Sequence, residues 1–342
     1  MISEAIQSLS KRLPPSWRVT TLGDEESARR SVDAVFKLTA PDGAALTCVV
    51  EAKSRIEPRD VPSLATQFRS YTGDIPIVIS TFLSPRTRER LEAVGLNYLD
   101  LAGNIRLAAD RPGLFMYERS ADQNPWREKR PARSLKGAKA GRIVRALCDF
   151  LPPLGVRGLA KKAGANPGYV SRTLALLDRE DLIRRSPRGP ITSMDWQGLI
   201  RRWAQDYSLL EPKRTGSYLE PRGLPNLFGK LAKVDFRYAV TGSFVASKIA
   251  PVASPRLLIC YVDDRRRAAE YLDLRPTEVG ANVILVQPFD PVVYERSWER
   301  EGMKFSALSQ VAADLETSPG RGPAEADALM KWMADNENAW RS

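Results

Sequence analysis

The 342-residue sequence contains no histidine and only three cysteines. The lack of histidine excludes Ser-His-Asp and Cys-His catalysis, histidine general bases and zinc sites of the Cys₂His₂ type. Cys48, Cys148 and Cys260 lie far apart within apolar segments, which is typical of buried free thiols rather than of a disulfide framework or a metal cluster. Any catalysis by this chain must therefore use carboxylates, lysine, hydroxyls and hard metal ions.

Long hydrophobic runs are absent too. No stretch approaches the roughly 18 apolar residues that a membrane span needs. The N-terminal MISEAIQSLSKRLPP mixes charged with apolar residues, unlike a signal peptide. We therefore expect a cytoplasmic protein with no membrane partner, whose length allows two or three domains.

Positive charge is concentrated in one part of the chain. The net charge is +11, and residues 127–190 contain 16 Lys and Arg against 5 Asp and Glu, which leaves the remainder near neutral. A local excess of positive charge is the electrostatic signature of a polyanion binder, most often of nucleic acid.

Residues 1–118 alternate between helical and strand-like patterns, which predicts an α/β domain with a mixed sheet. Asp42-Gly43 is a hairpin signal, and Gly103-Asn104 predicts a turn within a second hairpin, NYLDLAGNIRL. The predicted helices cover residues 2–13, 61–71 and 84–95, and the predicted strands cover residues 17–22, 33–40, 45–53, 75–81, 97–101, 104–109 and 114–119. Residues 119–140 have no hydrophobic period and are predicted to be a basic linker.

Residues 141–207 show three helical patterns and then a hairpin pattern. Helices are predicted at residues 141–151, 156–165 and 167–183, and Asn166 is the expected N-cap of the third. The short turn GAN before the third helix is typical of a helix-turn-helix. The stretch LIRRSPRGPITSM predicts a wing, formed by two short strands with a basic tip.

In such a module the third helix lies in the major groove of DNA and presents its early side chains to base edges and phosphates. The side chains expected to face outward are Tyr169, Ser171, Arg172 and Thr173. The inward stripe is expected to be Val170, Leu174 and Leu177. The wing residues expected to contact DNA are Arg184, Arg185 and Arg188. The segment VRGLAKKAGANPGYVSRTLALLDREDLIRR closely resembles the winged helix-turn-helix of bacterial transcriptional regulators; the alternative is a small helical bundle with an incidental basic face.

A second candidate site lies near the N-terminus, where ALTCVVEAK ends in Glu51 and Lys53. Alternate side chains of a strand point to the same face. If Asp33, at the start of the preceding strand, lies beside them, two carboxylates can hold Mg²⁺ while the lysine orients or activates the attacking water in phosphodiester hydrolysis. Gln67 and Tyr71 share a face of the following helix, placed to contact the phosphate chain. The alternative is the charged end of an ordinary strand and the polar side of an ordinary helix.

Asp33, Glu51-Ala-Lys53 and Gln67-Phe-Arg-Ser-Tyr71 resemble the RecB-type branch of the PD-(D/E)xK, restriction-endonuclease-like superfamily. The resemblance covers residues 1–118. It implies that Asp33 and Glu51 are metal ligands, that Lys53 is the catalytic lysine, and that Gln67 and Tyr71 position the substrate. It is stronger for the fold than for activity, because such domains also serve as binding or scaffolding units.

The C-terminal stretch AVTGSFVASKIAPVASPRLLICYVDD resembles the start of a nucleotidyltransferase-like domain. Active members carry an Asp-x-Asp or Asp-x-Glu soon after the Gly-Ser, but residues 251–256 contain no acid, and the adjacent Asp263 and Asp264 would point to opposite faces. We therefore expect no nucleotidyl transfer. QVAADLETSPGRGPAEADAL resembles the C-terminal part of AbiEi-family antitoxins of type IV toxin–antitoxin systems, which usually begin with their winged helix.

These patterns predict an α/β multi-domain protein. Its segments are a restriction-endonuclease-like domain (1–118), the basic linker (119–140), a winged helix-turn-helix (141–207) and an AbiEi-like, degenerate nucleotidyltransferase-like domain (208–342). The expected function is that of a sequence-specific, antitoxin-like transcriptional regulator, with or without a working nuclease site. The alternatives are a Mg²⁺-dependent DNA endonuclease of a defence or mobile-element system, targeted by its winged helix, and an antitoxin that acts only on protein. The expected partners are double-stranded DNA, a second copy of the chain and, for an antitoxin, a cognate toxin.

Overall fold

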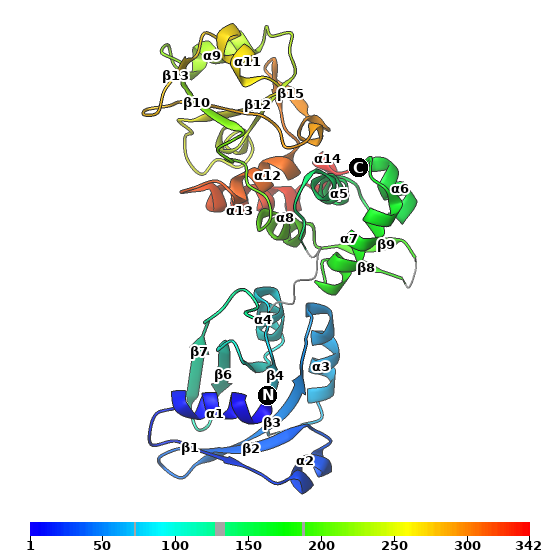
Figure 1. The fold of residues 1–342 in the computed structure, drawn as a ribbon, viewed down its shortest axis with the longest axis vertical. Coiled ribbons are helices and arrows are strands. Elements are labelled where there is room, and N and C mark those ends of the chain that lie inside the picture. Colours follow the sequence, from blue (N-terminus) through cyan, green and yellow to red (C-terminus); the bar gives the residue numbers. More distant parts are fainter. Residues whose placement is uncertain (72, 127–133, 187–188) are drawn as a thin grey trace. The chain divides into compact units, whose positions relative to one another are not determined.

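The computed structural model describes residues 1–71, 73–126, 134–186 and 189–342. The chain forms two compact units: unit 1 consists of Met1–Ala132 and Asp178–Asp181, and unit 2 consists of Arg133–Leu177 and Leu182–Ser342 (Figure 1). The division falls within the predicted linker, of which residues 127–133 lie outside the described part. The predicted segments 141–207 and 208–342 belong to the same unit.

The sheet of unit 1 has seven strands that follow one another in space as they do in the sequence. β4 pairs in parallel with β3 and with β5, and the other neighbouring pairs are antiparallel. The strands are β1 (Arg18–Thr21), β2 (Ala34–Thr39), β3 (Ala45–Lys53), β4 (Ile75–Ser80), β5 (Asn97–Asp100), β6 (Ile105–Ala109) and β7 (Leu114–Glu118). Each of them falls within a predicted strand, so the mixed sheet is confirmed.

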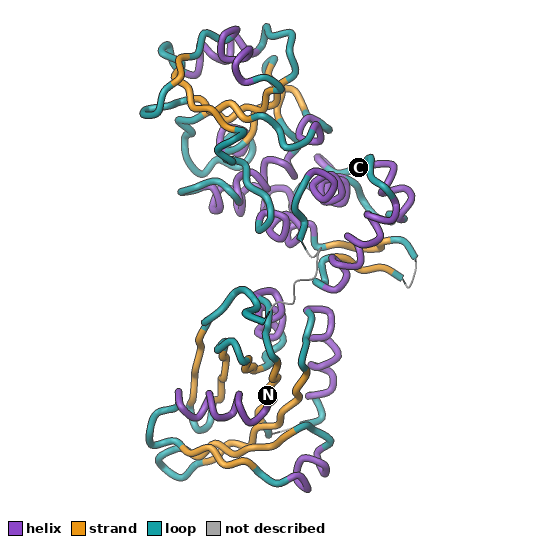
Figure 2. The backbone as a smooth tube through the Cα atoms, viewed as in Figure 1, coloured by secondary structure: helices purple, strands orange, loops and turns teal. Residues whose placement is uncertain are grey.

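Helices cover both faces of this curled sheet (Figure 2). One apolar cluster joins α1 to strand residues such as Leu38 and Leu99, and the other joins α3 and α4 to Val49 and Val78. The two clusters use alternate residues of the same strands because strand side chains alternate between faces. The helices are α1 (Ile2–Arg12), α2 (Asp24–Arg30), the 3₁₀ helix η1 (Pro58–Asp60), α3 (Val61–Phe68) and α4 (Pro85–Ala93). The patterns did not predict α2, whose seven mostly polar residues show no apolar period.

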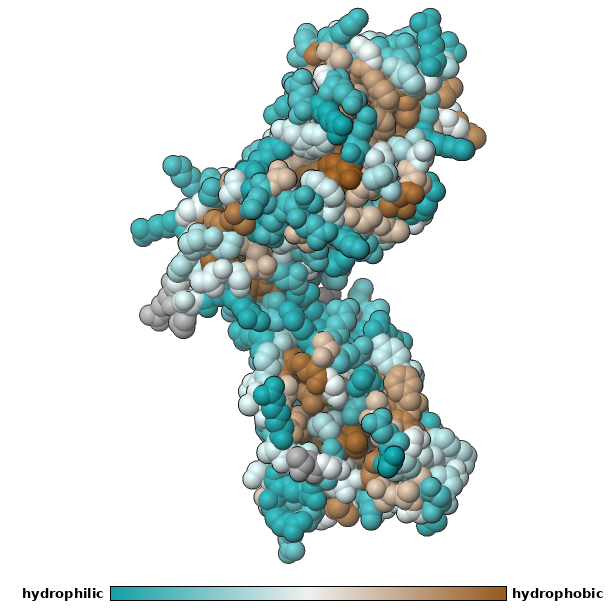
Figure 3. Space-filling model, turned by 180° about the vertical axis from the view of Figure 1, so that it is seen from behind, coloured by the Kyte–Doolittle hydropathy of each residue, from teal (hydrophilic) through white to brown (hydrophobic). Residues whose placement is uncertain are grey.

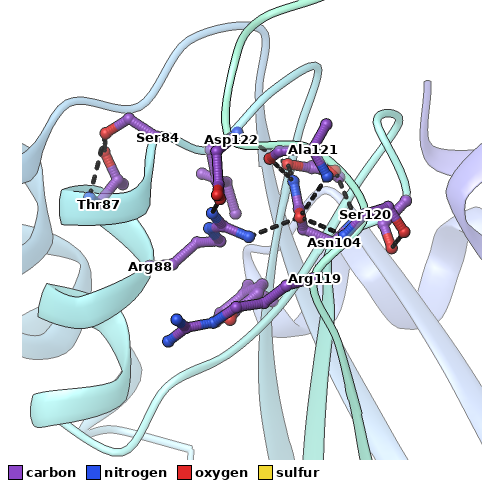
Figure 4. Close-up of polar contacts among 12 residues, drawn as sticks. Ser84, Thr87, Arg88, Asn104, Arg119, Ser120, Ala121 and Asp122 are labelled. Atoms are coloured by element: carbon purple, nitrogen blue, oxygen red, sulfur yellow. Dashed lines mark hydrogen bonds and ion pairs between the residues drawn. The ribbon is translucent and has the colours of Figure 1, made fainter. Parts of the chain in front are cut away.

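A buried polar cluster holds the chain where it leaves β7 (Figure 4). The side-chain oxygen of Asn104 accepts hydrogen bonds from the backbone N–H groups of Ser120 and Ala121. Arg88 of α4 is fully buried and donates to Asn104 and to the carboxylate of Asp122. This stretch was predicted to be linker, but it is part of the fold of unit 1, because Asn104 satisfies its backbone groups.

Unit 2 begins with helices and a short hairpin. These elements are α5 (Ala138–Asp149), α6 (Val156–Lys162), α7 (Pro167–Arg179), β8 (Ile183–Arg185), β9 (Ile191–Met194) and α8 (Trp196–Ala204). β8 and β9 pair antiparallel, and Leu154 forms a bridge to Ile191. The three predicted helices and the predicted hairpin are therefore confirmed. However, α5 starts three residues earlier than expected, inside the predicted linker, and α7 ends at Arg179, four residues before its predicted end, because Ile183 belongs to β8.

The rest of unit 2 contains a second mixed sheet of seven strands, in the order β13-β10-β14-β12-β11-β16-β15. Its strands are β10 (Thr215–Leu219), β11 (Tyr238–Thr241), β12 (Leu258–Val262), β13 (Arg275–Pro276), β14 (Val283–Val286), β15 (Trp298–Arg300) and β16 (Met303–Phe305). Its helices are α9 (Leu224–Leu231), α10 (Ser243–Ala246), α11 (Arg265–Tyr271), the 3₁₀ helix η2 (Pro291–Tyr294), α12 (Leu308–Glu316), α13 (Gly322–Asp335) and α14 (Glu337–Trp340). One apolar cluster runs from α5 to α13, so the helical segment and the sheet segment share a core.

Arg145 of α5, a helix that contributes to that shared core, is almost fully buried. Its guanidinium has five N–H donors, and each of them has an acceptor. The acceptors are Asp149 Oδ2 at 3.0 Å, Ser309 Oγ at 2.9 Å, Gln310 Oε1 at 3.0 Å, and the carbonyls of Val292 at 3.1 Å and Glu295 at 3.0 Å. Four of these five partners lie beyond residue 290. The buried guanidinium of Arg145 therefore links α5 to the C-terminal segment.

Asp314 of α12 is a second buried charge in the same region. Its carboxylate accepts hydrogen bonds from Tyr207 at 2.7 Å, from Tyr261 at 2.9 Å, from Gln310 at 2.8 Å and from Thr241. All four donors are neutral. Burial raises the pKa of Asp314 to about 6, although the hydrogen bonds act in the opposite direction.

The three cysteines are free and buried, as predicted. Burial raises the pKa of Cys48 to about 12, so this thiol is not a nucleophile at neutral pH. In the described part of the chain, no helix combines the length and apolar content needed to cross a membrane. The face of the molecule in Figure 3 is mostly hydrophilic, with small hydrophobic patches between polar areas.

Candidate functional sites

The strand register of unit 1 brings Asp33, Glu51 and Lys53 together, and we call these three residues the acidic–lysine site. Ala34 lies opposite Val50, which places Asp33 opposite Glu51 on the same face of the sheet. Lys53 follows Glu51 by two positions on β3, and its Nζ lies 3.4 Å from Glu51 Oε1. The neighbourhood that the sequence predicted for these three side chains is therefore present.

The two carboxylates of the acidic–lysine site differ in their surroundings. Asp33 is exposed, and its Oδ2 accepts a hydrogen bond of 2.7 Å from the backbone N–H of Ala52. The Glu51 side chain is only 14% exposed, whereas that of Lys53 is 46% exposed. A phosphate can therefore reach the site from the side of Asp33 and Lys53.

Gln67 lies in α3, but Tyr71 lies beyond the end of this helix at Phe68, so the prediction that the two residues share a helix face is wrong, and they have different partners. Gln67 Nε2 donates to Glu51 Oε2 at 2.8 Å, so it belongs to the acidic–lysine site. The hydroxyl of Tyr71 donates at 2.6 Å to the carbonyl of Arg30, the last residue of α2, which is followed by the turn that leads to Asp33. Ser31 in this turn has a left-handed backbone with φ of 52°, which its hydrogen-bonded neighbours must hold in place. Gln67 thus supports one carboxylate, and Tyr71 supports the turn before the other.

The donor set of the acidic–lysine site fits Mg²⁺. This ion prefers oxygen ligands and is often held by one or two carboxylates, with water and substrate phosphate completing its shell. Asp33 and Glu51 would supply the carboxylates, and Lys53 would offset the charge of a phosphate. Within the described ranges, no cluster of three or more acidic or sulfur ligands is found. Water and phosphate would therefore have to provide the remaining ligands.

Asp100 lies on the same sheet face, but its carboxylate is used by the fold. It is buried and accepts hydrogen bonds of 2.9 Å from the backbone N–H groups of Leu83 and Asn104. β5 and β6 pair antiparallel around this turn, so the predicted hairpin at residues 97–107 is confirmed.

In unit 2, the start of α7 has the predicted geometry. The side-chain oxygen of Asn166 accepts a hydrogen bond of 2.8 Å from the backbone N–H of Gly168 and so caps the helix. Gly164, in the turn between α6 and α7, has a left-handed backbone with φ of 54°, a conformation that glycine adopts at little cost. The inward stripe of Val170, Leu174 and Leu177 is buried, as expected.

The outward side of α7 carries fewer side chains than the sequence predicted. Ser171 and Arg172 are exposed, and Tyr169 is half-buried with the Arg172 guanidinium 5.8 Å from its ring centre. The prediction that Thr173 faces outward is wrong. Thr173 is 7% exposed, and its hydroxyl donates to the Tyr169 carbonyl one turn earlier.

On the hairpin, Arg184 is exposed and Arg185 is half-buried, whereas Arg188 lies outside the described residues. Two further cations, Arg157 and Lys161 of α6, are also exposed and were not predicted. Their i, i+4 spacing puts them on one side of the helix and was the available signal.

Asp263 and Asp264 of the C-terminal segment are both engaged in structural contacts. Asp264 caps α11 by accepting hydrogen bonds from the backbone N–H groups of Arg266 and Arg267. Asp263 forms an ion pair with Arg237 at 3.1 Å.

Comparison of the chain with protein-family models, with curated proteins and with solved structures found no match.

Proposed function

We propose that this protein is a sequence-specific, double-stranded-DNA-binding regulator of the antitoxin-like class, which reads DNA with a winged helix-turn-helix at residues 141–207. The observation that carries this proposal is the exposed pair Ser171 and Arg172 at the start of α7, flanked in sequence by exposed cations of α6 and of the β8–β9 hairpin. A capped helix with polar residues in its first turns is suited to the major groove. The flanking cations are suited to phosphate contacts, which strengthen binding by counterion release.

Replacement of Arg172 with alanine is expected to weaken binding of the full chain to its own promoter by about tenfold or more, because a single arginine contact to a base edge contributes about 1–3 kcal/mol. The fold should be unaffected, since Arg172 is exposed. Fluorescence anisotropy with a promoter fragment and with an unrelated duplex, over a range of salt concentrations, measures this effect.

Arg300→Ala is the matched control, because it removes the same charge from an exposed strand position of unit 2. It should leave the affinity within about twofold, since surface substitutions rarely change more. Equal affinities for Arg172→Ala and the wild type would rule out α7 as the reading helix.

A second candidate function is Mg²⁺-dependent cleavage of DNA, with a restriction-endonuclease-like unit 1. It is favoured by one observation, the placement of Asp33, Glu51 and Lys53 on one sheet face with Gln67 bonded to Glu51. In this role the bound ion would polarise the scissile phosphate. Asp33 and Glu51 would hold the ion, and Lys53 would orient the attacking water or stabilise the developing negative charge.

Lys53→Ala and Asp33→Asn are each expected to reduce metal-dependent nicking of supercoiled DNA by about 100-fold or more, because each removes a group that acts on the reacting phosphate. Lys37→Ala, an exposed lysine on neighbouring β2, is the control and should retain full activity. If wild-type protein leaves DNA intact with Mg²⁺ and with Mn²⁺, unit 1 is not a nuclease, and the regulator proposal stands alone.

A further inference from the structure

The outer edge of unit 1 has an unprotected strand. β7 is the last strand of its sheet, and no strand of the described chain pairs with its outer side. Natural edge strands are usually protected by lysine, proline or a bulge. β7 reads LFMYE: its one charged residue, Glu118, stands at its end, it contains neither lysine nor proline, and it pairs with β6 over five consecutive positions without a bulge.

Two aromatic side chains of β7 are exposed to solvent. Phe115 is 71% exposed and Tyr117 is 43% exposed. Their rings are parallel to within 7°, with centres 6.3 Å apart, on the sheet face opposite to half-buried Leu114 and Met116. Exposed apolar side chains that lie together are more often part of an interaction surface than single ones are.

The backbone groups of the same two residues also point outward. The N–H and C=O groups of Ala108 are bonded to the Asn97 side chain, on the β5 side of β6. Peptide groups alternate in direction along an antiparallel strand, so Arg106 also points towards β5. Phe115 lies opposite Ala108, and Tyr117 lies opposite Arg106. Both are therefore non-hydrogen-bonded pairs, and the N–H and C=O groups of Phe115 and Tyr117 face away from β6.

We propose that β7 is a dimerisation strand that pairs antiparallel with β7 of a second copy of this chain. A two-fold axis through Met116 sets Phe115 of each copy opposite Tyr117 of the other. This register forms four backbone hydrogen bonds and two aromatic cross-strand pairs. All four rings lie on the same face, because the axis is perpendicular to the sheet.

A second copy fits this edge because the strand is self-complementary. An aromatic residue stands one position before Met116 and another one position after it, so an antiparallel copy meets its own pattern. A single pair of five-residue strands buries less than the roughly 1,600 Å² of a standard interface, so the dimer should be reversible, with a dissociation constant in the micromolar range. The proposal goes beyond DNA binding and depends on unit 1 alone.

The first test is the double variant Phe115→Lys/Tyr117→Lys, which puts like charges opposite each other across the axis. Light scattering of the full chain over a concentration series should show a dissociation constant at least tenfold higher than that of the wild type. Val94→Lys is the control: it replaces another apolar residue of unit 1, 47% exposed and outside β7, and should dimerise normally. A wild type that is monomeric at high micromolar concentration overturns the proposal, and so does a dimer that the double variant leaves unchanged.

The second test does not depend on how the double variant folds. In the proposed register Met116 faces its own copy in a non-hydrogen-bonded pair, with Cα atoms about 4.5 Å apart, which suits a disulfide. Met116→Cys should therefore form a covalent dimer with oxidised glutathione, whereas the wild type should not, because its three cysteines are buried. Lack of cross-linking in a dimeric protein rejects this register.

A different occupant of β7 would give a different result. If the edge binds single-stranded nucleic acid by stacking, the double variant loses affinity for oligothymidylate while its oligomeric state is unchanged, and the dimer proposal is wrong. Loss of promoter binding in Arg172→Ala with an intact dimer concerns the proposed function only. The two proposals therefore fail separately.

Discussion

Replacing Arg145 with alanine is expected to lower the free energy of unfolding of unit 2 by about 3–5 kcal/mol, because removal of one partner from a buried ion pair leaves the other charge without compensation. This loss of stability should exceed the loss caused by removing one member of a neutral hydrogen-bonded pair. Asp149 would remain buried, and the acceptors at Ser309 and Gln310 would lose a charged donor. Denaturation by urea, followed by tryptophan fluorescence, measures this effect, since five of the seven tryptophans lie after residue 190.

Lys139→Ala is the matched control for Arg145→Ala. It removes a cation from the same helix at an exposed position, and should change stability by less than about 0.5 kcal/mol. If Arg145→Ala is no more destabilising than Lys139→Ala, the hydrogen bonds of Arg145 do not stabilise the packing of α5 against the C-terminal segment.

Asp314 is expected to make unit 2 more stable in mild acid than at neutral pH. Its pKa is about 6 in the folded protein against an ordinary value of 3.8. A carboxyl with a raised pKa binds its proton more tightly in the folded state, so its contribution to stability is complete below pH 4 and is lost as the pH rises through 6. At about 1.4 kcal/mol for each pKa unit, the loss is about 3 kcal/mol.

Asp314→Asn tests this prediction, because asparagine fills the same space and its side chain does not titrate. The difference in stability between the variant and the wild type should move by about 3 kcal/mol in favour of the variant between pH 4 and pH 8. Comparison of the two proteins cancels the titration of other carboxyls, including Glu316, whose pKa burial also raises. A difference that stays constant with pH would mean that Asp314 keeps its charge at low cost.

The regular elements of both units could be predicted because their apolar periods are local. β3 follows the predicted boundaries, and α7 begins at Pro167 after its asparagine cap. Thr173 shows the limit of this reasoning. The period of a helix places it at the border of the apolar stripe, and only the packing of the neighbouring helices decides that it is buried.

The contacts that hold Asp33 and Arg145 in their surroundings could not be predicted, because they join residues that are distant in the sequence. The bond from Tyr71 to the Arg30 carbonyl spans 41 positions, and the bond from Arg145 to Gln310 spans 165. No local pattern marks either pair. The strand register did place Asp33 beside Glu51, since a hairpin between consecutive strands fixes which residues are opposite.

The partners of Arg145 also limit how this protein can be divided. A fragment that ends at residue 207 would retain α5, α6, α7 and the β8–β9 hairpin, but it would lack four of the five acceptors of that guanidinium. The helical segment is thus not an autonomous module that could be transplanted onto another protein as a cassette. Recombination or engineering that keeps the fold of this segment has to carry the C-terminal sheet along with it.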